Sequence, residues 1–188
     1  MAVYAEQEII KGCLKKDRVY EEHLYKQYYS MFLAICMRYA KDVQNAKQLL
    51  NDGFVRIFMS IESFRNEGSF EGWMRKIIVN TCLEYIKSSD FKKNSQTVYT
   101  GVIDEEENMV VYNEAQKNID AHELIAMLQA LPQVTRVVFN LFAFEGYSHN
   151  EIAALLNISI GTSSWHVHNA RSILQRKMMI KNKLYEHK

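Results

Sequence analysis

The chain has 188 residues, 48% of them hydrophobic and 12% aromatic, which is enough for one folded domain or two small ones. No apolar run is long enough to cross a bilayer, and the start MAVYAEQEIIKGCLKK lacks the charged beginning and long apolar core of a secretory signal. The three cysteines, Cys13, Cys36 and Cys82, are scattered without metal-type pair spacing. We therefore expect a cytoplasmic protein with reduced thiols and no direct membrane insertion.

The net charge of +1 is unevenly distributed along the chain. Residues 1–90 carry 13 Lys and Arg against 12 Asp and Glu, residues 91–120 carry 3 against 6, and residues 121–188 carry 7 against 4. Within the last block, residues 171–188 hold 6 basic side chains and a single acidic one. The near-neutral total therefore does not exclude a polyanionic partner at the C-terminal end.

The N-terminal half predicts a helical bundle. One proline in the whole chain and little period-two alternation favour helices. Apolar residues recur every three or four positions in three successive segments, as in helices that bury one face against each other. The stripes are Leu24, Tyr28, Phe32, Ile35 and Tyr39; Leu49, Leu50, Phe54, Ile57, Phe58 and Ile61; and Phe70, Met74, Ile77, Ile78, Cys82 and Tyr85.

The periodic pattern stops between residues 91 and 118, where the sequence is polar and includes the acidic run 104–107. Periodicity resumes with IDAHELIAMLQALP, and Pro132 stands where the start of a further helix tolerates it. We expect an all-α fold in which two small helical domains, residues 1–90 and 119–188, are joined by a flexible acidic linker, residues 91–118.

The segment SHNEIAALLNISIGTSSWHVHNAR, residues 148–171, predicts two short helices around a tight turn. Ser148 and Glu151 have the spacing of a capping box, which begins the first helix. Asn157 tolerates a left-handed backbone at the turn, and Ser159 can cap the second helix.

The second helix of this pair has two different faces. Its inward face is expected to consist of Ile160, Ser163, Val167, Ala170 and Leu174. Its outward face offers hydrogen-bonding groups first and basic groups later, the pattern of a DNA recognition helix, in the residues Thr162, Trp165, His166, Asn169 and Arg176. A compact helical hairpin in an all-α core is the alternative that this pattern alone leaves open.

The C-terminal segment resembles region four of bacterial RNA polymerase sigma factors of the extracytoplasmic-function type (ECF, group IV). The family pattern is matched here by Pro132, Arg136, Gly146, Ser148, Glu151, Ile158, Gly161, Thr162, Ala170 and Arg171. The resemblance implies that this helix-turn-helix meets the −35 promoter element with Thr162, Ser164, Trp165, His166 and Asn169, and holds its backbone with Arg171, Arg176 and Lys177.

The N-terminal domain resembles region two of the same family, through Phe70, Trp73, Asn80, Glu84 and Lys87. The resemblance implies that this domain melts and reads the −10 element with Phe64, Phe70, Arg75, Lys76, Asn80, Glu84 and Lys87. An unstacked base can stack on Phe64 or Phe70, which flank the loop that contains Gly68, because such stacking gives ~1–3 kcal/mol per base, comparable to the cost of unpairing one. Trp73 is expected in the core.

The resemblance also implies binding partners: core RNA polymerase, through its β′ and β subunits, and promoter DNA, with an anti-sigma factor as a candidate third partner. The residues expected to meet the polymerase are Asp42, Gln48, Asn51, Asp52 and Phe54. Three carboxylates of the family pattern are missing from residues 45–52. We expect a sigma factor that directs RNA polymerase to specific promoters; the alternative is a sigma-like DNA-binding regulator that no longer programs core polymerase.

An enzyme and a purely structural helical adaptor are alternatives of other classes. His166 and His168 face different sides of a helix, so they cannot hold one ion together. No Gly-rich phosphate loop, nucleophile elbow or two-carboxylate pattern occurs, so we expect no catalytic residue, no metal and no cofactor. An adaptor would explain the bundles, but not the capped turn, the polar outward face and the basic tail together.

Overall fold

The computed structural model describes residues 4–88 and 121–186, and every regular element within these two ranges is helical. The all-α fold predicted from the sequence is confirmed. The chain divides into two compact units, Met1–Ser89 and Asp90–Lys188, each with its own buried side chains. The predicted acidic linker, residues 91–118, lies outside the described residues. Within the described ranges, no helix is both long and apolar enough to span a membrane.

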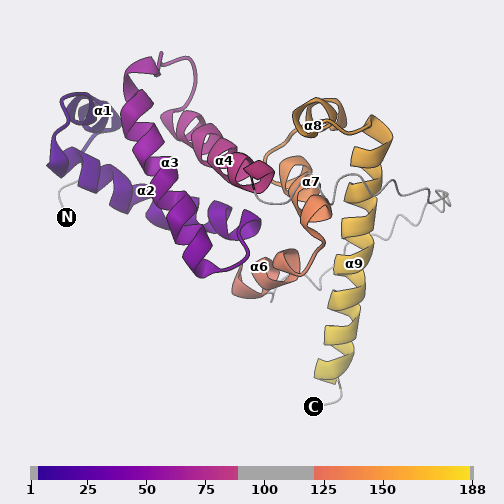
Figure 1. The fold of residues 1–188 in the computed structure, drawn as a ribbon. Helices are drawn as coiled ribbons and strands as arrows, with labels where there is room; N and C mark the ends of the chain where they lie inside the picture. The colour runs from indigo at the N-terminus through magenta and orange to yellow at the C-terminus, as the bar shows by residue number, and fades with distance from the viewer. Residues whose placement is uncertain (1–3, 89–120, 187–188) are drawn as a thin grey trace. The chain divides into compact units, whose positions relative to one another are not determined.

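The first unit is a helical bundle. Its elements are α1 (Glu6–Leu14), α2 (Arg18–Tyr39), α3 (Val43–Ser60), the 3-10 turn η1 (Ile61–Ser63) and α4 (Phe70–Ser88), shown in Figure 1. Helices α2, α3 and α4 each pack against the other two, while α1 packs on α2 and η1. Asp17 and Asp42 cap α2 and α3, since each carboxylate accepts a hydrogen bond from a backbone amide of the first turn.

The apolar stripes predicted from the sequence converge in the core of this unit. Phe32 on α2, Leu50 on α3 and Ile78 on α4 are completely buried. Burying a large apolar side chain contributes about 1.5–3 kcal/mol, so these contacts are the main force that holds the helices together. Cys36 and Cys82 lie in the same core with their sulfur atoms 3.9 Å apart, as small residues of the α2 and α4 stripes.

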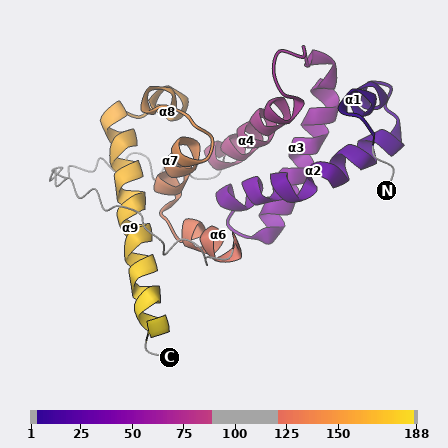
Figure 2. The same cartoon turned by 180° about the vertical axis from the view of Figure 1, so that it is seen from behind.

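The second unit is organised around one long helix. Its elements are α6 (Ala121–Gln129), α7 (Gln133–Ala143), α8 (His149–Leu156) and α9 (Ile160–Glu186). Figures 1 and 2 both show α6, α7 and α8 along the same side of α9. Pro132 is the residue that precedes α7, as predicted. A buried cluster joins α6 and the turn after it to α9, and consists of Leu128, Leu131, Ala170 and Leu174.

The turn between α8 and α9 has the predicted chemistry. Ser148 and Glu151 form a capping box, in which the Ser148 amide donates to the Glu151 carboxylate at 2.8 Å. Asn157 ends α8 in the left-handed conformation, with φ 55° and ψ 49°. The Ser159 hydroxyl accepts from the Thr162 amide at 2.9 Å and so caps α9. These local contacts fix where α8 ends and α9 begins.

Two side-chain contacts join α9 to the helices beneath it. Ser163 is completely buried, and its Oγ lies 3.0 Å from Nδ1 of His149 at the start of α8. Nδ1 of His166 lies 3.0 Å from Oγ1 of Thr135 on α7. Burial lowers the pKa of His166 below its usual 6.5, because the charged imidazolium loses hydration at this position. Both contacts are directional, so they help to set the rotation of α9 about its axis.

The lowered pKa of His166 makes the stability of the second unit depend on pH. Below pH 6.5 the unfolded chain binds a proton at His166 that the folded chain resists, so the free energy of unfolding falls as the pH drops from 6.5 toward the lowered pKa. We expect His166→Gln to reduce this loss. The measurement is the thermal midpoint at pH 7.5 and pH 5.5, roughly one unit either side of the ordinary histidine pKa.

The matched control for this prediction is His168→Gln, which removes an exposed histidine from the same helix. We expect this variant to keep the pH dependence of the unaltered protein. Equal pH dependence in the unaltered protein and in His166→Gln would contradict the assignment of the effect to His166.

Candidate nucleic-acid interface

The N-terminal part of α9 buries one face and exposes the other. The buried face consists of Ser163, Val167, Ala170 and Leu174. The opposite face, which we call the outward stripe, has the same spacing of four, three and four residues and consists of Trp165, Asn169, Ser172 and Arg176. Arg176 is exposed, and the other three are partly exposed. Aromatic and hydrogen-bonding groups predicted for the DNA-binding face are therefore at the surface.

Two residues of α9 depart from the sequence prediction. His166 was expected on the outward face, but it is partly buried against Thr135 of α7. Ile160 was expected on the inward face, but it is 55% exposed. The His166 ring meets the ring of Trp165 edge-on, with centroids 4.9 Å apart.

His168 is an outward residue that was not among those predicted for the −35 element. It is exposed, and it lies three residues after Trp165 and four after Ser164, so the three side chains share one side of α9. Thr162 and Ser164 are also exposed. The spacing from Trp165 is a signal in the sequence that favours His168 over His166 on this side of the helix.

Gly161 lies at the start of α9, and the fold gives no reason for a glycine there. It has helical backbone geometry, and an added Cβ would meet only the Ser159 hydroxyl, at an ordinary 3.7 Å. Glycine without a conformational or packing reason is typical of a position where another molecule approaches the backbone closely. Gly161 is exposed beside the outward stripe, where such an approach is possible.

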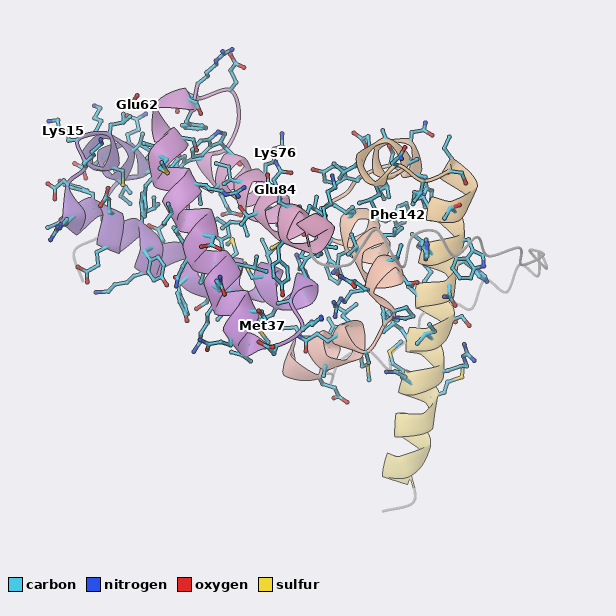
Figure 3. The ribbon with its side chains drawn as sticks, viewed as in Figure 1. Lys15, Met37, Glu62, Lys76, Glu84 and Phe142 are labelled. Atoms are coloured by element: carbon cyan, nitrogen blue, oxygen red, sulfur yellow. The ribbon has the colours of Figure 1, made fainter. Side chains whose placement is uncertain are left out.

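The basic residues of α9 differ in how they are held. The guanidinium of Arg171 lies over the Phe142 ring, 5.9 Å from its centroid, and Phe142 in turn stacks on His149 at 4.6 Å. Figure 3 labels Phe142 on α7. Arg171 and Arg176 are exposed and Lys177 is partly buried. The stacked contact keeps Arg171 extended at the surface, where a guanidinium can meet a phosphate.

The first unit has a half-open hollow of about 390 Å³ beside the start of α4. Gly68, in the loop that lines the hollow, has a φ of 119°, which residues other than glycine rarely adopt. The hollow combines aromatic rings, hydroxyl groups and both signs of charge, and its lining residues are Ser63, Phe64, Arg65, Glu67, Gly68, Ser69, Gly72, Trp73 and Lys76.

The aromatic residues at this hollow are arranged differently from the prediction. Phe70 is 1% exposed and belongs to the core, so it has no free face for an unstacked base. Phe64 is partly exposed and rests on Phe70 and Trp73, with ring centroids 5.0 and 5.5 Å apart. Trp73 was expected in the core, but it is partly exposed and lines the hollow. The two exposed rings are thus Phe64 and Trp73.

The remaining residues predicted for the −10 element lie along α4. Asn80, Glu84 and Lys87 are exposed, and Lys76 lines the hollow. Figure 3 shows Lys76 and Glu84 on this helix. The Glu84 carboxylate accepts from the Arg56 guanidinium of α3 at 2.6 Å. Glu84 is therefore held by α3 through Arg56, a residue that no sequence pattern predicted for this site.

Arg75 also lies on α4 and is partly exposed.

No group of three or more histidine, cysteine, aspartate or glutamate side chains in residues 4–88 or 121–186 is placed to hold a metal ion.

Four of the five residues predicted to meet RNA polymerase are exposed on α3 or at its start. These are Asp42, Gln48, Asn51 and Asp52. Backbone and side-chain hydrogen bonds from Asn45 lower the pKa of Asp42, so its carboxylate serves first as the helix cap. Phe54 is 2% exposed and packs on Tyr25 at 4.6 Å, so it belongs to the core rather than to a contact surface.

A neighbouring pair of α3 residues was not selected from the sequence. Val55 and Met59 are 55% and 80% exposed, and they continue the line of Gln48 and Asp52 at helical spacing. We call these four residues the α3 stripe. Val55 and Met59 are apolar, but the helical period places them outside the apolar stripe that includes Phe54. This mismatch is the signal in the sequence that could have identified the pair.

Comparison with protein families identifies both units. The family model of Sigma-70 region 2 matches residues 24–91, and that of Sigma-70, region 4 matches residues 121–174. The two regions occur in this order and together cover most of the described residues of the chain.

Curated relatives carry the same assignment. The chain is 22% identical to the RNA polymerase sigma-H factor of Pseudomonas aeruginosa over 185 residues, covering 92% of this chain and 93% of that protein. It is 22% identical to the ECF RNA polymerase sigma-E factor of Escherichia coli (strain K12), with 92% and 94% covered. It is 27% identical over 157 residues to the ECF RNA polymerase sigma factor SigE of Mycolicibacterium smegmatis, covering 82% of this chain and 60% of that protein.

Two solved structures share the fold. One is the sigma factor RpoE from Bartonella quintana in complex with the anti-sigma factor NepR, with a TM-score of 0.50, 18% identity, and 84% of this chain and 95% of that chain covered. The other is CnrH in complex with the cytosolic domain of CnrY, with a TM-score of 0.50, 15% identity, and 94% and 99% covered. Both family regions, the named relatives and the shared fold agree: the chain belongs to the extracytoplasmic-function sigma factors, which direct RNA polymerase to specific promoters.

Proposed function

We propose that this sigma factor reads the −35 element with the outward face of α9 and accommodates an unstacked base of the −10 element in the hollow beside α4. The observation that carries the proposal is the capped turn at Asn157 and Ser159, which presents α9 with Trp165 and Asn169 facing away from the core. A helix held in this way can enter a major groove with its polar side toward the base edges.

The residue roles at the −35 element follow from exposure. Base contacts are assigned to Thr162, Ser164, Trp165, His168 and Asn169. Arg171, Arg176 and Lys177 are assigned to phosphates, since they follow the reading segment along α9 and carry positive charge. His166 is given a positioning role instead, because its contacts are with Thr135 and Trp165.

The hollow in the first unit offers what an extruded base requires. Phe64 and Trp73 provide exposed ring surface, and Lys76 on the rim provides a positive charge for a nearby phosphate. Stacking on an aromatic ring gives about 1–3 kcal/mol per base, which is comparable to the cost of unstacking and unpairing it. Opening of DNA then needs no covalent step, and we assign the protein no enzymatic activity.

The α3 stripe is the surface that we assign to core RNA polymerase. It carries one carboxylate, from Asp52, together with the amide of Gln48 and the apolar side chains of Val55 and Met59. The scarcity of carboxylates is the observation that favours a second candidate function, a sigma-like regulator that binds DNA without programming polymerase.

An anti-sigma factor that covers this sigma factor is a further proposed partner, because two proteins of the same fold have been solved in complexes, one of them with an anti-sigma factor. Core RNA polymerase and promoter DNA are in the bacterial cytoplasm, so we propose that this sigma factor acts there.

The two candidate functions are separated by retention of core RNA polymerase on the immobilised full-length protein, followed by run-off transcription from a promoter library. Stable retention and defined start sites are expected. Met59→Lys should reduce retention, because it places a charge in the α3 stripe. Val19→Lys alters another exposed apolar side chain, at the start of α2, and should not reduce it. DNA binding without retention of polymerase would favour the regulator.

Phe64→Ala tests the hollow. Loss of the ring should lower promoter opening by about tenfold, in line with the 1–3 kcal/mol of one base–aromatic stack. The measurement is permanganate reactivity of unpaired thymines in the −10 element, with holoenzyme at saturating concentration. Phe58→Ala removes a similarly half-buried ring from α3 and serves as the control for a general loss of stability. Equal promoter opening by the two variants would contradict the assignment.

Gly161→Ala tests close approach of DNA to the start of α9. Because the added methyl meets only the Ser159 hydroxyl, the variant should be as stable as the original protein or more stable by about 0.4–1 kcal/mol. Holoenzyme binding to promoter fragments should nevertheless weaken. Thermal melting and competition binding measure the two effects separately. Unchanged binding would show that Gly161 faces open solvent in the complex.

A further inference from the structure

The centre of the outward stripe carries side chains that are neutral. Trp165 and Asn169 are one turn apart near the start of α9, and Ser172 follows a turn later. Arg171 points away from this line toward the Phe142 ring, and Arg176 is the first positive charge on the stripe. Trp165, Asn169 and Ser172 can therefore recognise bases only by neutral hydrogen bonds and apolar contact.

We propose that Asn169 reads an adenine and that Trp165 contacts the methyl group of a thymine, so that the −35 element of this sigma factor has A·T base pairs where the centre of the stripe docks. The proposal rests on the function assigned above to α9 and adds the identity of the bases. It depends on the neutral centre of the stripe, a property of this chain's own residues.

The hydrogen-bonding groups of Asn169 match one base. In the major groove adenine offers the N7 acceptor beside the N6 amino donor, and an asparagine amide can donate to the first and accept from the second. Guanine offers two acceptors side by side and calls for two donors, which arginine or lysine supplies. Neither of these residues occupies Trp165, Asn169 or Ser172, so guanine has no matching partner at the centre of the stripe.

The Asn169 amide is available for this contact. No hydrogen bond within the part of the chain that the structure describes engages it, and the residue is partly exposed. Its direction is fixed by the residues on the other side of the helix, since Ser163 is tied to His149 and Ala170 is completely buried. An amide that lies on the outward face and has no partner among the described residues is suited to a partner outside the chain.

Trp165 adds the apolar contact. Its indole lies at the surface one turn before Asn169, and the His166 ring meets it at an interplanar angle of 73°. His166 is itself held by Thr135, so the indole rests against a side chain that cannot swing away freely. The thymine methyl is the only apolar group that the base pairs present in the major groove, and it is what an exposed ring can recognise there.

The test uses the holoenzyme formed with core RNA polymerase and a promoter library randomised in the −35 element. Adenine should be enriched at one position, and Asn169→Ala should remove that preference by about tenfold, the discrimination of one bidentate pair. Asn169→Arg should shift the preference at the same position to guanine. Arg176→Ala should weaken all sequences alike, which distinguishes a phosphate contact from base recognition.

Two modified promoters test the individual atoms. Replacement of the selected adenine by 7-deaza-2′-deoxyadenosine removes the N7 acceptor and keeps the base pair, and should weaken the original protein but not Asn169→Ala. Replacement of the neighbouring thymine by deoxyuridine removes the methyl group, and should weaken the original protein but not Trp165→Ala.

The outcomes distinguish a failure of the base assignment from a failure of the proposed function. If the original protein gives defined start sites and Asn169→Ala leaves every base preference unchanged, the inference is overturned and the proposed function stands. The absence of any start site would overturn both. Enrichment of guanine by the original protein at the position that responds to Asn169 would also overturn the inference.

Discussion

The rotation of α9 about its own axis is the constraint on which the proposed DNA-binding face depends. Apolar burial alone sets it loosely, because Val167, Ala170 and Leu174 would tolerate a range of angles. The Ser163–His149 and His166–Thr135 contacts are directional, and both involve the first two turns. A rotation that broke them would leave buried polar groups unpaired, which costs roughly 1–3 kcal/mol for each group. The outward direction of Asn169 is therefore a consequence of what is hydrogen-bonded on the other side.

In the first unit, the orientation of a surface side chain is set by packing of aromatic rings. Phe70 is part of the core, and Trp73 stacks on it at an interplanar angle of 12°. Phe64 then rests on both rings from the loop. A surface ring is thus supported by a buried one, so its orientation is already set in the free protein, as the base stacking that we propose would require. Preformed stacking surfaces of this kind reduce the entropy lost when a ligand binds.

The arrangement of helices could be predicted because it follows from local rules and periodicity. The capping box at Ser148, the left-handed Asn157 and the cap at Ser159 each depend on residues close in the sequence. Exposure at the boundary of a helix face could not be predicted in the same way. His166 lies at such a boundary, and only the presence of Thr135, 31 residues earlier, determines that it turns inward. Phe70 was predicted both for an apolar stripe and for base stacking, and its burial shows that the periodic pattern was the better guide there.

The composition of the α3 stripe suits the contact with core RNA polymerase that we propose for it. Exposed charges are screened beyond about 8 Å at physiological ionic strength, and exposed ion pairs contribute only about 0–1 kcal/mol each. Full burial of an aliphatic or methionine side chain contributes about 1.5–3 kcal/mol. Burial of Val55 and Met59 against a partner can therefore offset the carboxylates that the stripe lacks. Charge mainly accelerates encounter, so a stripe of this composition favours slower association rather than a weaker complex.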